Sequence, residues 1–284
     1  MCVIHALRRW LGAGVVLAIS GCAVLQSPAE RADAQAKAGN FHSVAALAGP
    51  VRAWLRPFLP ADGDASVSNP ELTIYIEGDG AEWRGKYRPP SDPTPDNALS
   101  LRLALREPGA PVAYLGRPCQ YLDHDTLSQC PPRLWMGARF GEQATDIMNA
   151  AIDVLLQVAS ARRVRLVGYS GGGAMAALLA ARRSDVTCLV TVAAPLDTDA
   201  WTTAIAVSPL TESVNPLTQV SRIAPIAQTH IAGAADKMVP VRTLRRFTSA
   251  LPAPDVSVID GFDHDCCWVL NWEKLRQGTC LATL

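Results

Sequence analysis

Residues 166–183 read LVGYSGGGAMAALLAARR, and this stretch sets the fold expected for the chain. A short apolar run leads to a serine set among glycines, and an alanine- and leucine-rich stretch follows. The Gly-x-Ser-x-Gly pattern around Ser170 is a weak signal on its own, because it arises easily by chance. Its context is stronger, since a strand at Val164–Val167 turns directly into a helix at Gly172–Arg183. Such a tight turn strains the serine backbone and leaves room only for glycine beside it.

Strands and helices alternate along most of the remaining chain. Periodicity predicts strands at Leu72–Glu77, Pro111–Leu115, Val164–Val167, Val186–Val192, Pro225–Ile231 and Val256–Ile259. It predicts helices at Asn97–Arg106, Arg139–Ala159, Gly172–Arg183, Val241–Leu251 and Cys267–Arg276. This alternation indicates an α/β fold with a mostly parallel central sheet flanked by helices. The alternation fails at residues 196–224, where we expect a short lid-like insertion or a plain surface loop.

A serine nucleophile needs a base to take its proton, and the base needs an acid to orient it. In chains built on this kind of serine turn, the order is serine, acid, histidine. His42 and His124 precede Ser170, and His230 lies inside a predicted strand, where a packed histidine is expected. His264, in a loop after the last predicted strand, is therefore the predicted base.

The acid is expected in a loop that follows a strand between the serine and the histidine. Asp236 follows a predicted strand directly and precedes a helix. Asp197 and Asp199, after the preceding strand, are the alternatives. The carboxylate of Asp236 would accept the Nδ1–H of His264 and stabilise the imidazolium.

An oxyanion hole needs two N–H groups aimed at one point. The N–H of Gly171, at the start of a helix whose positive end suits a developing negative charge, is one predicted donor. The loop Gly78–Gly80, after an early strand, would supply the other, with the N–H of Asp79 preferred to that of Gly80. The alternative is that this loop is only a turn.

Four stretches, IYIEGDG (74–80), LGRPCQY (115–121), LVGYSGGGAMAALLAARR and HIAGAADKMVP (230–240), resemble the α/β-hydrolase superfamily. More narrowly, they resemble a group of exported proteobacterial α/β-hydrolase lipoproteins. The resemblance runs from about Leu72 to Trp272 and implies the fold and the triad, but no substrate. Two features depart from the usual pattern. Glu77 occupies the place of a common histidine, and the vicinal cysteines after His264 are atypical.

The N-terminus has the features of an export signal. Arg8 and Arg9 precede an apolar run at residues 10–19, and small residues then lead to Cys22. This ending resembles the bacterial lipobox, in which the cysteine carries palmitate-type acyl chains that anchor the protein to a membrane. An ordinary signal peptide is the alternative. Ala23 in place of an aspartate favours the outer over the inner membrane, with the protein facing the periplasm.

The resulting domain organisation has three parts. Residues 1–21 are predicted to be a lipoprotein signal peptide, residues 22–45 a tether, and residues 46–284 the α/β-hydrolase domain. Of the eight cysteines, six lie beyond the lipidation site, an even number that favours disulfides in an oxidising compartment. We expect Cys119 to pair with Cys130, and either Cys266 or Cys267 to pair with Cys280. No metal-ligand spacing occurs, and no cofactor is expected.

The composition, 49% hydrophobic and 18% charged with a formal net charge of zero, is that of a globular protein and not of a nucleic-acid binder. The predicted function is a membrane-anchored serine hydrolase, resembling a carboxylesterase or lipase, that acts on a small-molecule or lipid ester. An amidase, peptidase or thioesterase would use the same triad. A non-catalytic lipoprotein that binds an envelope component is the alternative from another class.

Overall fold

The structure, a computed structural model, describes residues 26–45, 47, 49–58, 71–80, 90–109 and 111–282. The predicted signal peptide and the lipidation site at Cys22 lie outside this part of the chain. No helix among the described residues is both long enough and apolar enough to cross a membrane.

A single eight-stranded sheet forms the centre of the described chain, in the order β1-β2-β4-β3-β5-β6-β7-β8. The strands from β4 to β8 are parallel, whereas β1 and β2 pair antiparallel at one edge. The mostly parallel sheet predicted from the sequence is therefore confirmed. The strands are β1 (His42–Ser43), β2 (Ala53–Arg56), β3 (Glu71–Ile76), β4 (Val112–Leu115), β5 (Arg163–Tyr169), β6 (Val186–Val192), β7 (Ala227–Gly233) and β8 (Val256–Ile259).

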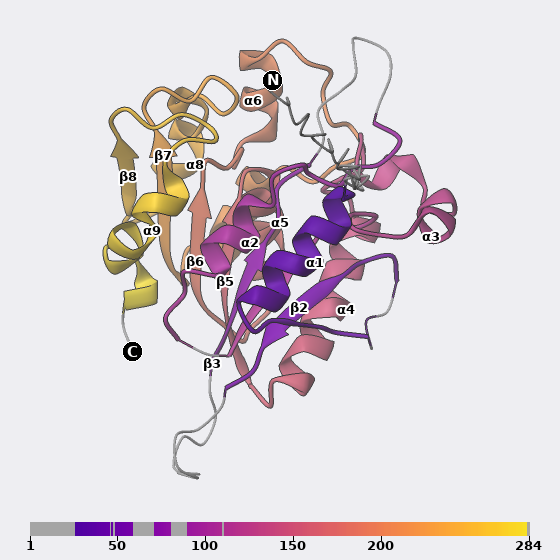
Figure 1. Cartoon of the computed structure of the whole chain (residues 1–284). Helices are drawn as coiled ribbons and strands as arrows, with labels where there is room; N and C mark the ends of the chain where they lie inside the picture. The colour runs from indigo at the N-terminus through magenta and orange to yellow at the C-terminus, as the bar shows by residue number, and fades with distance from the viewer. Residues whose placement is uncertain are drawn as a thin grey trace, which may run out of the picture.

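Helices cover both faces of this sheet (Figure 1). Alternate residues of β3 face opposite sides of the sheet. Leu72 and Ile74 pack with α4 (Glu142–Val158) and α5 (Gly171–Ala180), whereas Tyr75 packs with α2 (Leu99–Ala104) and α9 (Trp268–Gln277). Both faces are buried, as parallel sheets require. The helices are α1 (Pro28–Ala38), α2 (Leu99–Ala104), α3 (His124–Ser128), α4 (Glu142–Val158), α5 (Gly171–Ala180), α6 (Thr198–Ala204), α7 (Val220–Ile223), α8 (Arg245–Ser249) and α9 (Trp268–Gln277), with short 3₁₀ turns between them.

The N-terminal boundary of the domain differs from the prediction. Part of the predicted tether folds as α1, which begins with a reciprocal cap between Ser27 and Glu30. Ala32 and Ala36 of this helix are buried, and Asp33 accepts a hydrogen bond of 2.7 Å from the indole of Trp54. The tether prediction is therefore wrong from residue 28 onward. Two alanines spaced by four make only a narrow apolar stripe, which is easily missed in a polar, alanine-rich sequence.

The predicted lid-like insertion lies between β6 and β7 and contains α6, the 3₁₀ turn Pro216–Gln219 and α7. The indole of Trp201 in α6 donates to the carbonyl of Met238 at 2.8 Å. The insertion is thereby tied to the loop that follows β7.

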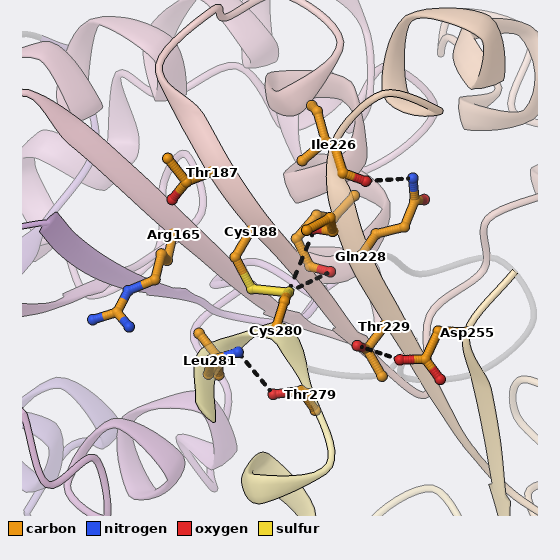
Figure 2. The surroundings of a disulfide bond; sticks show 12 residues. Arg165, Thr187, Cys188, Ile226, Gln228, Thr229, Asp255, Thr279, Cys280 and Leu281 are labelled. Carbon is orange, nitrogen blue, oxygen red and sulfur yellow. Dashed lines mark hydrogen bonds between the residues drawn. A yellow bond between two sulfur atoms is a disulfide. The ribbon is translucent and has the colours of Figure 1, made fainter. Parts of the chain in front are cut away.

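Three disulfides join cysteines within the described part of the chain, and one pairing differs from the prediction. Cys119 pairs with Cys130, the pair favoured by the sequence, but Cys280 pairs with Cys188 of β6 (Figure 2). Cys266 pairs with its neighbour Cys267. The predicted bond from Cys280 to one of these two is wrong because α9, about 15 Å long, carries the chain from the carboxyl edge of the sheet to its amino edge.

Candidate active site

The turn from β5 into α5 holds Ser170 in an unusual backbone conformation, with φ +51° and ψ −128°. A side chain at Gly168 would collide with the backbone of Gly172, and one at Gly172 would collide with the carbonyl of Ile76. The glycines therefore allow α5 to start directly beneath the serine. The backbone N–H of Ser170 donates to Val192 at 2.8 Å, which ties the turn to β6.

The structure brings the three predicted side chains together at the carboxyl edge of the sheet. The Nε2 of His264 lies 3.0 Å from the hydroxyl oxygen of Ser170, and its Nδ1 lies 2.9 Å from Oδ2 of Asp236. Because the carboxylate can only accept, Nδ1 carries the proton and Nε2 presents its lone pair to the serine hydroxyl. The other carboxylate oxygen accepts the N–H groups of Met238 and Val239, each at 2.8 Å.

Two side chains that the sequence did not single out support His264. The hydroxyl of Tyr169 donates to the carbonyl of His264 at 2.9 Å, and the indole of Trp268 donates to the same oxygen at 2.8 Å. Burial raises the pKa of Tyr169, so its hydroxyl stays protonated and can donate. Tyr169 precedes the serine directly, so the turn that places the nucleophile also places the base.

The alternative acids and bases lie elsewhere. Asp197 caps α6 and pairs with Arg246 at 3.1 Å, and Asp199 accepts a hydrogen bond from Asn215. His230 is buried in β7 between Thr191 and Gln228, and burial lowers its pKa to about 4. His42 and His124 are exposed on β1 and α3, so none of these groups is placed to serve the serine.

The loop Gly78–Gly80, called the oxyanion loop below, lies against the nucleophile turn. A Cβ added to Gly78 would lie 3.4 Å from the Cβ of Ser170, and one added to Gly171 would collide with the Asp79 carboxylate. Within the described part of the chain, the backbone N–H groups of Asp79, Gly80 and Gly171 have no hydrogen-bond acceptor. All three are therefore candidate donors to an oxyanion.

Charged groups surround this loop. Asp79 pairs with Arg117 at 3.2 Å and with Arg139 at 2.8 Å. Burial opposes ionisation, but the two guanidinium groups outweigh it and keep the pKa of Asp79 below its usual value. Glu77 accepts the N–H of Gly78 and the hydroxyl of Tyr114, each at 2.8 Å, and burial raises its pKa. Glu77 thus supports the loop without reaching the nucleophile.

Among the residues that the structure describes, no group of three or more histidine, cysteine, aspartate or glutamate side chains is arranged to hold a metal ion. The polar groups that meet at Ser170 are a hydroxyl, an imidazole, a carboxylate and backbone N–H donors. This set is suited to proton transfer and to stabilising an oxyanion.

No family model and no curated protein matches the sequence. Solved structures match the fold well: the esterase Pf2001 of Pyrococcus furiosus has a TM-score of 0.56 at 14% identity, with 86% of this chain and 93% of that chain covered. XC6422 of Xanthomonas campestris, described as an α/β serine hydrolase without a lid, has a TM-score of 0.51 at 16% identity, with 84% and 93% covered. The chain has the α/β-hydrolase fold.

A puromycin hydrolase matches with a TM-score of 0.55 at 18% identity over 79% of this chain, which spans 35% of that longer protein. At these identities the similarity establishes the α/β-hydrolase fold and not an activity. In this fold, the turn from β5 into α5 and the loops after β7 and β8 meet at the carboxyl edge of the sheet, where ligands of such sheets bind. Ser170, Asp236 and His264 lie on these three connections.

Proposed function

We propose that the protein is a serine hydrolase that cleaves a carboxylic ester, with Ser170 as nucleophile, His264 as general base and acid, and Asp236 as the orienting acid. The observation that supports this most strongly is the unbroken relay of two hydrogen bonds, 3.0 Å and 2.9 Å long, from the serine hydroxyl to the buried carboxylate.

The reaction follows from this geometry in two halves. Ser170 attacks the ester carbonyl while its proton passes to Nε2 of His264, and the Asp236 carboxylate stabilises the imidazolium. When the tetrahedral intermediate collapses, the alcohol leaves with that proton and an acyl-serine remains. Water then attacks the acyl-serine, with His264 again accepting and returning one proton. The acid is released and the serine hydroxyl is restored.

The negative oxygen of the tetrahedral intermediate is stabilised by the N–H groups of Gly171 and Asp79, with that of Gly80 as the alternative second donor. Both preferred donors lie beside Ser170 and have no protein acceptor among the described residues. Losing one such donor typically lowers turnover by about 10²–10³-fold.

A panel of chromogenic esters, thioesters and anilides tests the bond type. We expect the mature wild-type protein to hydrolyse esters faster than thioesters or anilides, and the Ser170→Ala variant to be inactive against all of them. Equal rates for the two proteins would refute the proposed function. Faster cleavage of anilides or thioesters would instead indicate that the protein is an amidase or a thioesterase.

We also propose that the protein is anchored through Cys22 to the periplasmic side of the bacterial outer membrane, where lipid esters are close to the site. The support is the sequence alone: basic residues, a short apolar run and small residues precede this cysteine. Incorporation of an alkyne-tagged palmitate into the wild type but not into Cys22→Ser tests it. Equal labelling of both proteins would exclude acylation at Cys22.

A further inference from the structure

The stretch LGRPCQY has no part in the proposed triad, yet it lies beside the site. Its residues 117–121 follow β4 and form a turn, called the supporting turn below, in which Arg117, Cys119, Gln120 and Tyr121 are all buried. Cys119 and Tyr121 have φ values of +73° and +62°, which cost free energy for residues with a side chain. The disulfide from Cys119 to Cys130 links this turn to the end of α3.

Gln120 of the supporting turn holds the oxyanion loop by a backbone carbonyl. Its Nε2 donates to the carbonyl of Gly78 at 2.9 Å and to that of Pro93 at 3.3 Å. Its Oε1 accepts the N–H of Arg117 at 2.9 Å, which fixes the orientation of the side-chain amide. The side-chain amide of Gln120 therefore joins the supporting turn to the oxyanion loop in a fixed orientation.

The carbonyl of Gly78 and the N–H of Asp79 belong to one planar peptide group and point in opposite directions. By holding the carbonyl from one side, Gln120 fixes the direction of the N–H on the other side. This N–H is the preferred second donor to the oxyanion.

The side chain of Asp79 is held as well. Its two oxygens pair with the guanidinium groups of Arg117 and Arg139, and Arg117 also donates to the carbonyl of Arg139 at 2.6 Å. Asp79 is thereby fixed through both its preceding peptide group and its carboxylate. The two guanidinium groups offset the negative charge of this carboxylate, which lies against Gly171.

We propose that Gln120 and Arg117 are positioning residues, which hold the N–H of Asp79 in the direction that stabilises the oxyanion. The inference rests on the proposed ester hydrolysis at Ser170. The oxyanion forms only along the reaction, so a misdirected N–H lowers kcat and leaves substrate binding nearly unchanged. The supporting turn thus acts on turnover without touching the substrate.

The test compares Gln120→Met with Gln228→Met in the full mature protein. Gln228 is a matched control, because its Nε2 also donates to two backbone carbonyls, those of Ile223 and Ile226, but at the start of β7. We expect Gln120→Met to lower kcat roughly 10–100-fold with KM changed less than about threefold. The affinity for a trifluoromethyl ketone, which forms a tetrahedral adduct on the serine, should fall in parallel. Gln228→Met should change neither value more than about twofold.

Equal kcat values for Gln120→Met and Gln228→Met would overturn the inference, as would a loss confined to KM. If Gln120→Met does not fold, Gln120→Asn replaces it, because its shorter side chain cannot span from Arg117 to Gly78, and the same division between kcat and KM is expected. A wild-type protein that hydrolyses no ester contradicts the proposed function itself. An active wild type together with Gln120 variants of unchanged kcat would contradict only the positioning role of Gln120.

Discussion

The disulfide between Cys188 and Cys280 should contribute more to stability than either of the other two. It joins positions 92 residues apart, whereas Cys119 and Cys130 are separated by 11 and Cys266 and Cys267 are adjacent. In the chain-entropy model, a disulfide stabilises the folded protein by lowering the entropy of the unfolded chain. The expected stabilisation is about 4.6 kcal/mol for Cys188–Cys280, about 2.8 kcal/mol for Cys119–Cys130 and less than about 1 kcal/mol for Cys266–Cys267. The predicted order of the three contributions follows directly from the pairing.

Three double variants test this order, each with both cysteines of one disulfide replaced by alanine so that no free thiol remains. Urea unfolding without reductant gives the free energy of unfolding for each. We expect the loss to be largest without Cys188 and Cys280, intermediate without Cys119 and Cys130, and smallest without Cys266 and Cys267. Cys188 pairs with Arg165 and Ala227 near the starts of β5 and β7, whereas Ser170 follows the other end of β5, so the variant without Cys188 and Cys280 should keep its ester hydrolysis rate when folded. A larger loss without Cys119 and Cys130 would refute the reasoning, as would a hydrolysis rate that falls with the folded Cys188 variant.

Three further predictions concern single residues. Asp236→Asn should lower kcat by about 10⁴-fold, because the amide favours the wrong tautomer of His264, and steady-state kinetics at pH 7 would show it. Tyr169→Phe should lower kcat roughly 2–10-fold, since the carbonyl of His264 keeps one of its two side-chain donors; an unchanged kcat would exclude the positioning role of Tyr169. Burial lowers the pKa of His230 to about 4 from 6.5, so the unfolded chain binds a proton that the folded chain excludes between these pH values. The contribution of neutral His230 to the free energy of unfolding is complete above pH 6.5 and falls by roughly 3 kcal/mol between pH 6.5 and pH 4. Urea unfolding should therefore show a smaller loss of stability over this pH range for His230→Gln than for the wild type.

The sequence predicted those parts of the fold that local pattern controls. The strands of the parallel sheet and helices α4, α5 and α9 follow from periodicity that extends over several residues. Strand β1 was missed because it is only two residues long, and β2 was missed because it pairs antiparallel and lies outside the alternation of strands and helices. Helix α1 was missed because alanine alone supplies its buried face.

In the candidate site, too, local pattern predicts some features and not others. The positions of Ser170, Asp236 and His264 could be predicted because each follows a strand of a parallel sheet, and such strand ends meet at one edge. The contacts of Gln120, Arg117 and Arg139 with the oxyanion loop could not, because they join segments up to 60 residues apart through side-chain geometry. The partner of Cys280 was missed for a related reason, since the length and direction of α9 decide which edge of the sheet the cysteine reaches.

Labelling with a fluorophosphonate probe, followed by mass spectrometry of the modified peptide, tests the hydrolase mechanism most directly. The probe phosphonylates a serine only when a neighbouring base activates it. We predict one label per chain, on Ser170, and a loss of labelling in both Ser170→Ala and His264→Ala. Labelling on a different serine, or equal labelling of the wild type and His264→Ala, would contradict the assignment of the nucleophile and its base.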